Sequence, residues 1–213
     1  MMPRTAPHRR RLAGEARAYA AAGWPVAAGA WWDPRDARYR CAQPNCVTEG
    51  LHPTLPGASF GVRRCQVSVV QASTRDLSAV VGLWRRWPYS VLLPTGQVSD
   101  VVELRASSAR RMQALRAAYG QLGPVATFPD GRVLLFTAVA GAPDADLAAE
   151  LASVGALHHS QGSWVPLPPS QLASGPLDWT HSPGAAQWRL PSLHEVTDVL
   201  RLALSSASPA EGR

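Results

Sequence analysis

The sequence of 213 residues contains no lysine, no isoleucine and a single asparagine, Asn45. Arginine therefore supplies every cationic side chain apart from histidine. This bias is typical of a GC-rich coding sequence, in which arginine, alanine, glycine and proline codons are abundant. An arginine in this chain is therefore a weaker sign of phosphate binding than in a chain that also uses lysine.

Long apolar runs are also missing, since no stretch reaches the roughly 18 uninterrupted apolar residues of a membrane-spanning helix. We therefore expect no membrane partner. Apolar residues nevertheless make up 46% and charged residues 17% of the chain. This composition indicates a sizeable core and excludes general disorder. The length favours one large domain or a domain with a tail.

Cysteine is scarce, and the three residues present form an odd number. This count fits a reduced cytoplasmic protein better than a disulfide framework. The arginine-rich N-terminus followed by Ala28–Ala30 superficially resembles a signal peptide. However, Glu15, Arg17 and Pro25 interrupt the segment that would have to be apolar. We therefore expect a cytoplasmic location.

The net charge of +6 is unevenly distributed along the chain. Residues 1–17 carry five arginines and one glutamate, a net charge of +4, which leaves +2 for the rest. A basic surplus favours nucleic acid or another anionic partner. We predict that residues 1–11 form a flexible basic arm that contacts DNA or RNA through four arginines: Arg4, Arg9, Arg10 and Arg11.

The hydrophobic pattern predicts one α+β domain over residues 12–204, with a mixed or antiparallel sheet flanked by helices. Helices are expected at 11–22, 77–86, 106–119, 144–153 and 192–204. Strands are expected at 67–70, 90–93, 100–104, 125–128, 133–137 and 163–167. Residues 168–191 read as a loop, and residues 205–213 as a disordered tail.

The strongest local chemistry lies in a loop at about residues 33–65, where Cys41, Cys46 and His52 follow one another closely. Thiolate and imidazole ligands suit tetrahedral zinc, and a bound metal can stabilise a loop that has no core. A closed site needs a fourth ligand, for which Cys65 is the first candidate and His8 the second. The alternative is that the cysteines are small buried apolar residues.

Several segments in order resemble motifs of the bifunctional DNA primase/polymerase family, called Prim-Pol here. They lie within about residues 15–204 and comprise the first helix with Gly23–Val26, the cysteine loop ending in Gly50–Pro53, Trp84–Pro88 with Val91–Gly96, and Gly162–Ser170. The resemblance implies an archaeal-primase-like sheet with an RRM-like core, and a role in DNA replication. It also implies a helicase acting in trans, because a chain of this length has no room for a helicase domain.

The same resemblance implies catalysis through Mg²⁺ or Mn²⁺, held by an Asp-x-Asp strand pair and a later third carboxylate. On this alignment Leu104 and Ala106 occupy the two aspartate positions, and no acid stands just before Gly162. The turn that would carry a phosphate-binding histidine, Pro129–Leu134, contains none. The cysteine loop also departs from the family, because Tyr39 takes the expected first ligand position.

These departures leave three interpretations open. The leading one is a Prim-Pol-like, DNA-binding protein of replication or regulation with a degenerate active site and lost or reduced catalysis. The second is an active primase/polymerase that uses Asp100 and Glu103, although residues three apart on a strand share a face only at a bulge. The third is an adaptor without nucleic-acid affinity. We interpret His158 and His159 as a turn-flanking pair in preference to a metal or phosphate contact.

Overall fold

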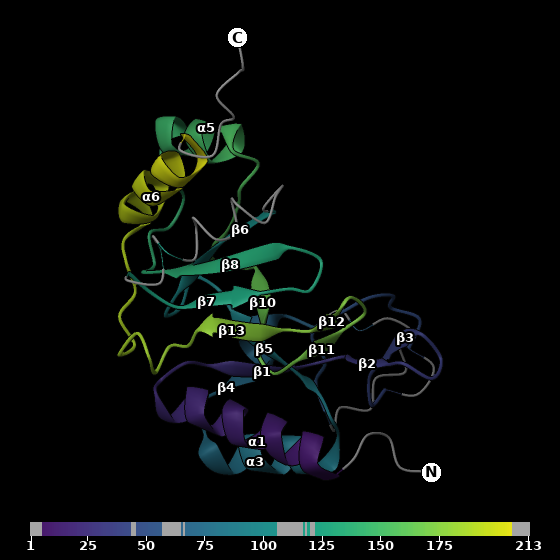
Figure 1. Cartoon of the computed structure of the whole chain (residues 1–213). Helices are drawn as coiled ribbons and strands as arrows, with labels where there is room; N and C mark the ends of the chain where they lie inside the picture. Colours follow the sequence, from purple (N-terminus) through teal and green to yellow (C-terminus); the bar gives the residue numbers. More distant parts are fainter. Residues whose placement is uncertain are drawn as a thin grey trace. The chain divides into compact units, whose positions relative to one another are not determined.

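The computed structural model describes residues 6–43, 46–56, 65, 67–105, 117, 119 and 122–205 (Figure 1). Its elements, in chain order, are α1 (Ala6–Ala21), β1 (Val26–Gly29), β2 (Trp31–Asp33), β3 (Arg38–Arg40), α2 (Val69–Ala72), β4 (Ser73–Thr74), α3 (Leu77–Arg86), β5 (Ser90–Pro94), β6 (Asp100–Arg105), β7 (Val125–Thr127), β8 (Arg132–Thr137), α5 (Ala145–Ser153), β9 (Leu157–His159), β10 (Trp164–Leu167), β11 (Gln171–Leu172), β12 (Gly175–Pro176), β13 (Asp178–His181) and α6 (Leu193–Ser205). The expected α+β class is confirmed. The chain divides into two compact units, a first comprising residues 1–98 with 162–178 and a second comprising 99–161 with 179–213.

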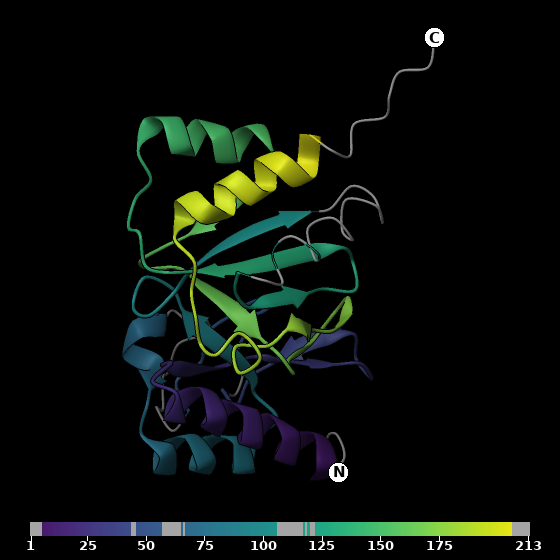
Figure 2. The same cartoon turned by 60° about the vertical axis from the view of Figure 1, so that its left-hand side comes forward.

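The first unit is built on a sheet with the strand order β10-β5-β1-β4. Its helices α1 and α3 pack side by side (Figures 1 and 2). Their contact buries apolar side chains from both helices: Leu12, Ala16, Tyr19, Val80 and Trp84. Arg75, just before α3, donates from Nε to the carbonyl of Gly23, just after α1, at 2.7 Å. The start of α3 therefore lies beside the end of α1, and the two helices run antiparallel.

Helix α1 begins at Ala6, earlier than the expected helix at 11–22. Residues 6–11 are therefore helical and not part of a flexible arm. Pro7 suits the first turn of a helix, where its missing N–H is not needed, and arginine is a good helix former. Three of the predicted nucleic-acid contacts, Arg9, Arg10 and Arg11, thus lie on α1, while Arg4 lies outside the described residues.

The second unit contains a sheet with the order β13-β7-β8-β6-β9. Strands β6 and β8 pair without interruption from Asp100 opposite Thr137 to Arg105 opposite Arg132. Helices α5 and α6 cover one face of this sheet (Figure 2). Alternate strand residues and the two helices share one apolar core that includes Val102, Leu104, Val133, Leu135, Leu147, Leu151, Val196 and Leu200.

Four expectations differ from the structure or fall outside it. The strand expected at 67–70 is wrong, because Val69–Ala72 form the short helix α2, and so short an apolar run does not distinguish helix from strand. Part of the loop expected at 168–191 is the strand β13. The helix expected at 106–119 and the tail expected at 205–213 lie mostly outside the described residues.

Candidate metal centre and active-site strand

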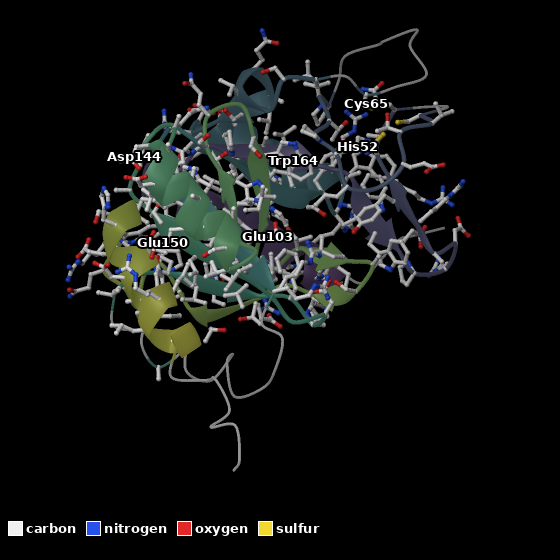
Figure 3. The ribbon with its side chains drawn as sticks, turned by 90° about the horizontal axis from the view of Figure 1, so that it is seen from above. His52, Cys65, Glu103, Asp144, Glu150 and Trp164 are labelled. Atoms are coloured by element: carbon white, nitrogen blue, oxygen red, sulfur yellow. The ribbon has the colours of Figure 1, made fainter. Side chains whose placement is uncertain are left out.

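The first unit brings together all four candidate metal ligands, although Cys65 is far from the others in sequence. One ligand atom from each of Cys41, Cys46, His52 and Cys65 lies within 4.8 Å of the rest. The Sγ atom of Cys65 is 3.4 Å from that of Cys46 and 3.7 Å from that of Cys41. Figure 3 shows Cys65 beside His52. Cys65, and not His8, thus completes the group among the described residues.

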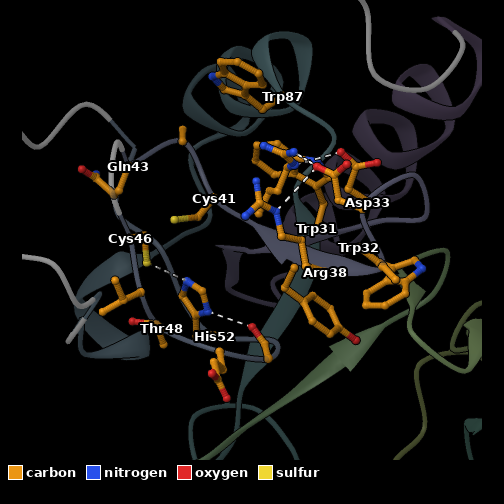
Figure 4. Close-up of a pocket in the computed structure, with 18 of the residues that line it drawn as sticks. Trp31, Trp32, Asp33, Arg38, Cys41, Gln43, Cys46, Thr48, His52 and Trp87 are labelled. Carbon is orange, nitrogen blue, oxygen red and sulfur yellow. Dashed lines mark hydrogen bonds and ion pairs between the residues drawn. The ribbon is translucent and has the colours of Figure 1, made fainter.

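Neighbouring groups orient these ligands. The Nδ1 atom of His52 is 2.9 Å from the carbonyl oxygen of Gly50, so Nδ1–H donates there and Nε2 faces the thiols, 3.8 Å from Cys46 Sγ (Figure 4). The backbone N–H of Cys65 donates to the Thr48 hydroxyl at 2.9 Å. Burial raises the pKa of Cys46, but hydrogen bonds from Thr48 outweigh it and lower the pKa to about 7.

The donor set fits a metal ion such as zinc. Three sulfurs and one imidazole nitrogen converge, and the nitrogen is held by a carbonyl on the far side of its ring, as is usual for metal-bound histidine. Tyr39, at the ligand position that departs from the family pattern, lies on β3 and accepts a hydrogen bond from the N–H of Ala173 at 3.1 Å. Cys65 therefore brings the group to four potential ligands, although Tyr39 supplies none.

A pocket of about 1320 Å³ adjoins this group, lined by the β2–β3 hairpin, the cysteine loop and Trp87 (Figure 4). Trp31 stacks on Trp87 with ring centroids 5.4 Å apart. Two hairpin arginines pair with acids of the same hairpin, Arg38 with Asp36 and Arg40 with Asp33, the latter at 2.9 Å. The positive charge around this pocket is therefore largely neutralised locally.

In the second unit, Asp100 and Glu103 lie on opposite faces of β6. The pairing of β6 with β8 has no bulge, so side chains alternate strictly between the two faces. Asp100 is fully buried, and its Oδ2 accepts the N–H of Ala140 at 2.9 Å and lies 3.4 Å from His158 Nε2. Its Oδ1 has no hydrogen-bond partner among the described residues. The structure therefore does not bring the two candidate catalytic acids together.

Glu103 lies on the face of the sheet away from α5 and α6, where both of its oxygens have partners. Oε1 accepts from Arg132 Nη1 at 3.1 Å, and Oε2 lies 3.0 Å from His159 Nε2. Arg132 also contacts Asp130 at 3.0 Å. The hydrogen bond from His159, followed by the interactions of Arg132, lowers the pKa of Glu103. Glu103 is thus held ionised within a hydrogen-bonded cluster.

The two positions aligned with the Asp-x-Asp pair, Leu104 and Ala106, lie at the end of β6 and just after it. Leu104 belongs to the core against the helices, and Ala106 lies outside the described residues. The opposite face of β6 presents Glu103 and Arg105, which alternate with Leu104 along the strand. Arg105 is exposed and donates from Nη1 to the carbonyl of Asp130 at 3.2 Å. The face of β6 away from the helices therefore presents one carboxylate and one guanidinium at alternate positions.

His158 and His159 both lie on β9, beside β6, and each lies close to one of the two acids. Sequence reasoning did not predict this pairing. The usable signal was the combination of two adjacent histidines and two acids three residues apart, because both patterns place their members on opposite faces of a strand. Burial lowers the pKa of His158, and Asp100 opposes that shift.

No second metal site is evident in the described part of the chain. There, the Cys41, Cys46, His52 and Cys65 group stands as the one cluster of three or more potential ligands close enough to hold an ion. The residues outside the described ranges add one further acid, Glu211. The side chains around β6 therefore do not fit a pair of catalytic Mg²⁺ or Mn²⁺ ions.

Comparison with known families matches residues 16–195 to the N-terminal domain of the bifunctional DNA primase/polymerase family. The chain belongs to this family. The match confirms the Prim-Pol resemblance and covers both units described above. Comparisons with curated proteins and with solved structures found no match.

Prim-Pol membership places the chain in a family of replication-related nucleic-acid enzymes and implies nucleic-acid binding. None of the described helices is long and apolar enough to cross a membrane. Mg²⁺ or Mn²⁺ is typical for the family. Among the described residues, the side chains on β6 do not form a group of carboxylates for such ions, and in this respect the chain differs from what membership implies.

Proposed function

We propose that this Prim-Pol chain is a nucleic-acid-associated protein of replication, or of its regulation, in which nucleotidyl transfer is lost or strongly reduced. The observation that carries the proposal is the face of β6 that presents Glu103 beside Arg105. Two-metal transfer needs carboxylates that converge on both ions. Beside Glu103 on this face, Arg105 supplies a positive charge where two-metal transfer would require a second carboxylate.

The state of Glu103 supports the same conclusion. A metal ion would have to displace Arg132 and His159 from its two oxygens. The four charged side chains of the cluster, Glu103, Asp130, Arg105 and Arg132, sum to no net formal charge. Such a cluster does not attract a divalent cation as a group of acids does.

The geometry disfavours the alternative of catalysis through Asp100 and Glu103. That alternative requires a bulge in β6, whereas six consecutive pairs join β6 to β8 in regular register. It also requires Asp100 to reach a substrate, whereas this side chain is fully buried and bound to Ala140.

The test is primer extension and primer synthesis on a DNA template with Mg²⁺ and with Mn²⁺. We expect no template-dependent incorporation above a protein-free control. Incorporation that is abolished by the pair Asp100→Asn and Glu103→Gln would establish the active alternative. Incorporation that survives this pair would also overturn the proposal, because the chemistry would then lie elsewhere.

Nucleic-acid association distinguishes this proposal from an adaptor without nucleic-acid affinity. Contacts to phosphates release counterions, so their affinity falls steeply as salt is added. We expect the protein to bind DNA at low salt with an affinity that falls steeply as salt is added. No binding at low salt would favour the adaptor.

We further propose that Cys41, Cys46, His52 and Cys65 hold a structural zinc ion. The four ligands come from both ends of a loop whose described residues form little regular structure after β3. A closed four-ligand site stabilises such a loop and leaves no position for a substrate. Its role is therefore to hold the loop against the β2–β3 hairpin.

A further inference from the structure

The outer surfaces of α1 and α3 have an unusual composition. On α1 the exposed positions are Pro7, Arg10, Arg11, Gly14, Arg17, Ala18 and Ala21. On α3 they are Leu77, Ser78, Ala79, Gly82, Arg85 and Arg86. Apart from Leu77, which is 37% exposed, both surfaces consist of arginines among small side chains. We call the two surfaces together the α1/α3 face.

The antiparallel packing gathers these arginines from distant parts of the sequence. Because α3 starts beside the end of α1, its last turn lies beside the first half of α1 (Figures 1 and 2). Arg85 and Arg86 therefore stand at the same end of the helix pair as Arg10 and Arg11. The sequence shows two separate arginine runs, and the fold joins them.

The charge on the α1/α3 face is largely unpaired. Residues 6–23 and 75–87 contain seven arginines against two acids, a net charge of +5 out of +6 for the chain. Among the described residues, Arg10, Arg17, Arg85 and Arg86 contact no acid. Arg11 approaches Asp178 only at 3.8 Å. The hairpin arginines near the pocket differ, because acids of that hairpin neutralise them.

Helix stability does not account for the arginines at the start of α1. The N-terminal end of a helix carries partial positive charge and favours acids, yet the first turn of α1 has none. Arg85 and Arg86 at the end of α3 do favour that helix, since its C-terminal end is negative. The arginines of α1 therefore point to an external anion.

We propose that the α1/α3 face binds the sugar-phosphate backbone of a nucleic-acid duplex without sequence preference. This inference rests on the nucleic-acid association proposed above. Glycine, alanine and serine allow a backbone to approach closely, and guanidinium groups bind phosphate oxygens. The 16 residues of α1 span about 24 Å, which corresponds to roughly seven phosphates along one strand.

The face favours a duplex over other polyanions. Binding of single strands relies on aromatic side chains that stack on bases, whereas Tyr19 and Trp84, the aromatic residues of the two helices, are buried. Binding to an anionic membrane relies on an apolar helix face that inserts among lipids. The small exposed side chains of α1 and α3 provide no such face.

The test adds the full chain to a fluorescein-labelled mixed-sequence DNA duplex and measures the fluorescence anisotropy of the duplex. The titration is repeated over a series of salt concentrations. The variants are Arg10→Gln with Arg17→Gln on α1, and Arg85→Gln with Arg86→Gln on α3. Each lost phosphate contact should reduce the magnitude of the negative slope of log K against log salt by about 0.9. Each pair should lower affinity at least about tenfold at 0.1 M salt. Circular dichroism checks that each variant is folded.

A matched control removes the same charge from the hairpin through Arg38→Gln and Arg40→Gln, which should leave affinity and slope nearly unchanged because both side chains pair with acids. Wild-type binding that neither helix pair weakens would overturn this inference and leave the nucleic-acid association intact. Absence of any wild-type binding would overturn both. Equal or tighter binding of the separated single strand, or of phosphatidylserine vesicles, would overturn the assignment to a duplex.

Discussion

At the scale of single residues, neighbours decide what an acidic side chain can do. Asp100 and Glu103 are close in sequence, yet one is fully buried beside His158 and the other is bound to Arg132 and His159. Each acid is thus held by its own partners on its own face of β6. Neither is available for a shared metal ion.

The pairing of Glu103 predicts an acid-dependent contribution to stability. Its pKa is lowered in the folded state by the hydrogen bond from His159 and by Arg132. The stabilisation is therefore fully present above the unfolded pKa of about 4.3 and is lost as pH falls through the lower folded value. We expect Glu103→Gln to flatten this acid limb when denaturant midpoints are measured between about pH 6 and pH 3. An unchanged limb would show that Glu103 gains nothing from its partners.

The metal group gives a second prediction at this scale. We expect elemental analysis by mass spectrometry to find nearly one zinc ion per chain in the purified wild-type protein. Cys46→Ser or Cys65→Ser should lose most of this zinc, because a site left with three ligands binds zinc weakly. His8→Ala is the control and should keep its zinc. Full zinc content in Cys65→Ser would exclude Cys65 as a ligand.

At the scale of elements, local signals located most helices and strands well. Asp76 caps α3 by accepting the N–H of Ala79 at 2.7 Å, and Trp87 ends the helix just before Pro88. Signals of this kind act within a few residues, so they are readable in a sequence. The strands β4 and β13 were not predicted, because their pairing partners are distant in sequence. The helix α2 was not predicted, because so short an apolar run does not distinguish helix from strand.

The cap of α5 provides a prediction for one element. Asp144 accepts the N–H of Leu147 at 2.9 Å, whereas Asp146 lies inside the first turn. We expect Asp144→Ala to lower the free energy of unfolding by about 1 kcal/mol. Asp146→Ala, the matched control, should cost about 0.5 kcal/mol at most, since it loses only the interaction with the helix dipole. Equal losses in urea denaturation would show that the cap has no special role.

At the scale of the whole molecule, the first of the two segments that form the second unit, residues 99–161, begins and ends on neighbouring strands. This segment starts at residue 99, just before β6, and ends at residue 161, just after β9, and the chain returns to the unit at residue 179. These strands pair directly, and the Asp100–His158 and Glu103–His159 contacts join them from both faces. The entry and exit of the inserted segment are thus joined within one sheet.

Metal removal should affect one unit more than the other. All four candidate ligands belong to the first unit. We expect a chelator to increase amide hydrogen exchange in residues 38–56 and to leave β6 and β8 nearly unchanged, since their core lies within the second unit. Cys46→Ser should reproduce the pattern without a chelator. A uniform increase across both units would show that the metal stabilises the whole chain.

The sequence by itself determined the family, the α+β class, three candidate metal ligands (Cys41, Cys46 and His52) and the absence of an Asp-x-Asp pair from residues 100–106. These properties reside in residue types, short spacings and periodicity, which are present before the chain folds. Only the tertiary structure decided that Leu104 faces the core, that Glu103 and Arg105 share the opposite face, and that Arg85 and Arg86 join the arginines of α1. Which face is covered, and which distant segments meet, depends on long-range packing that no local pattern encodes.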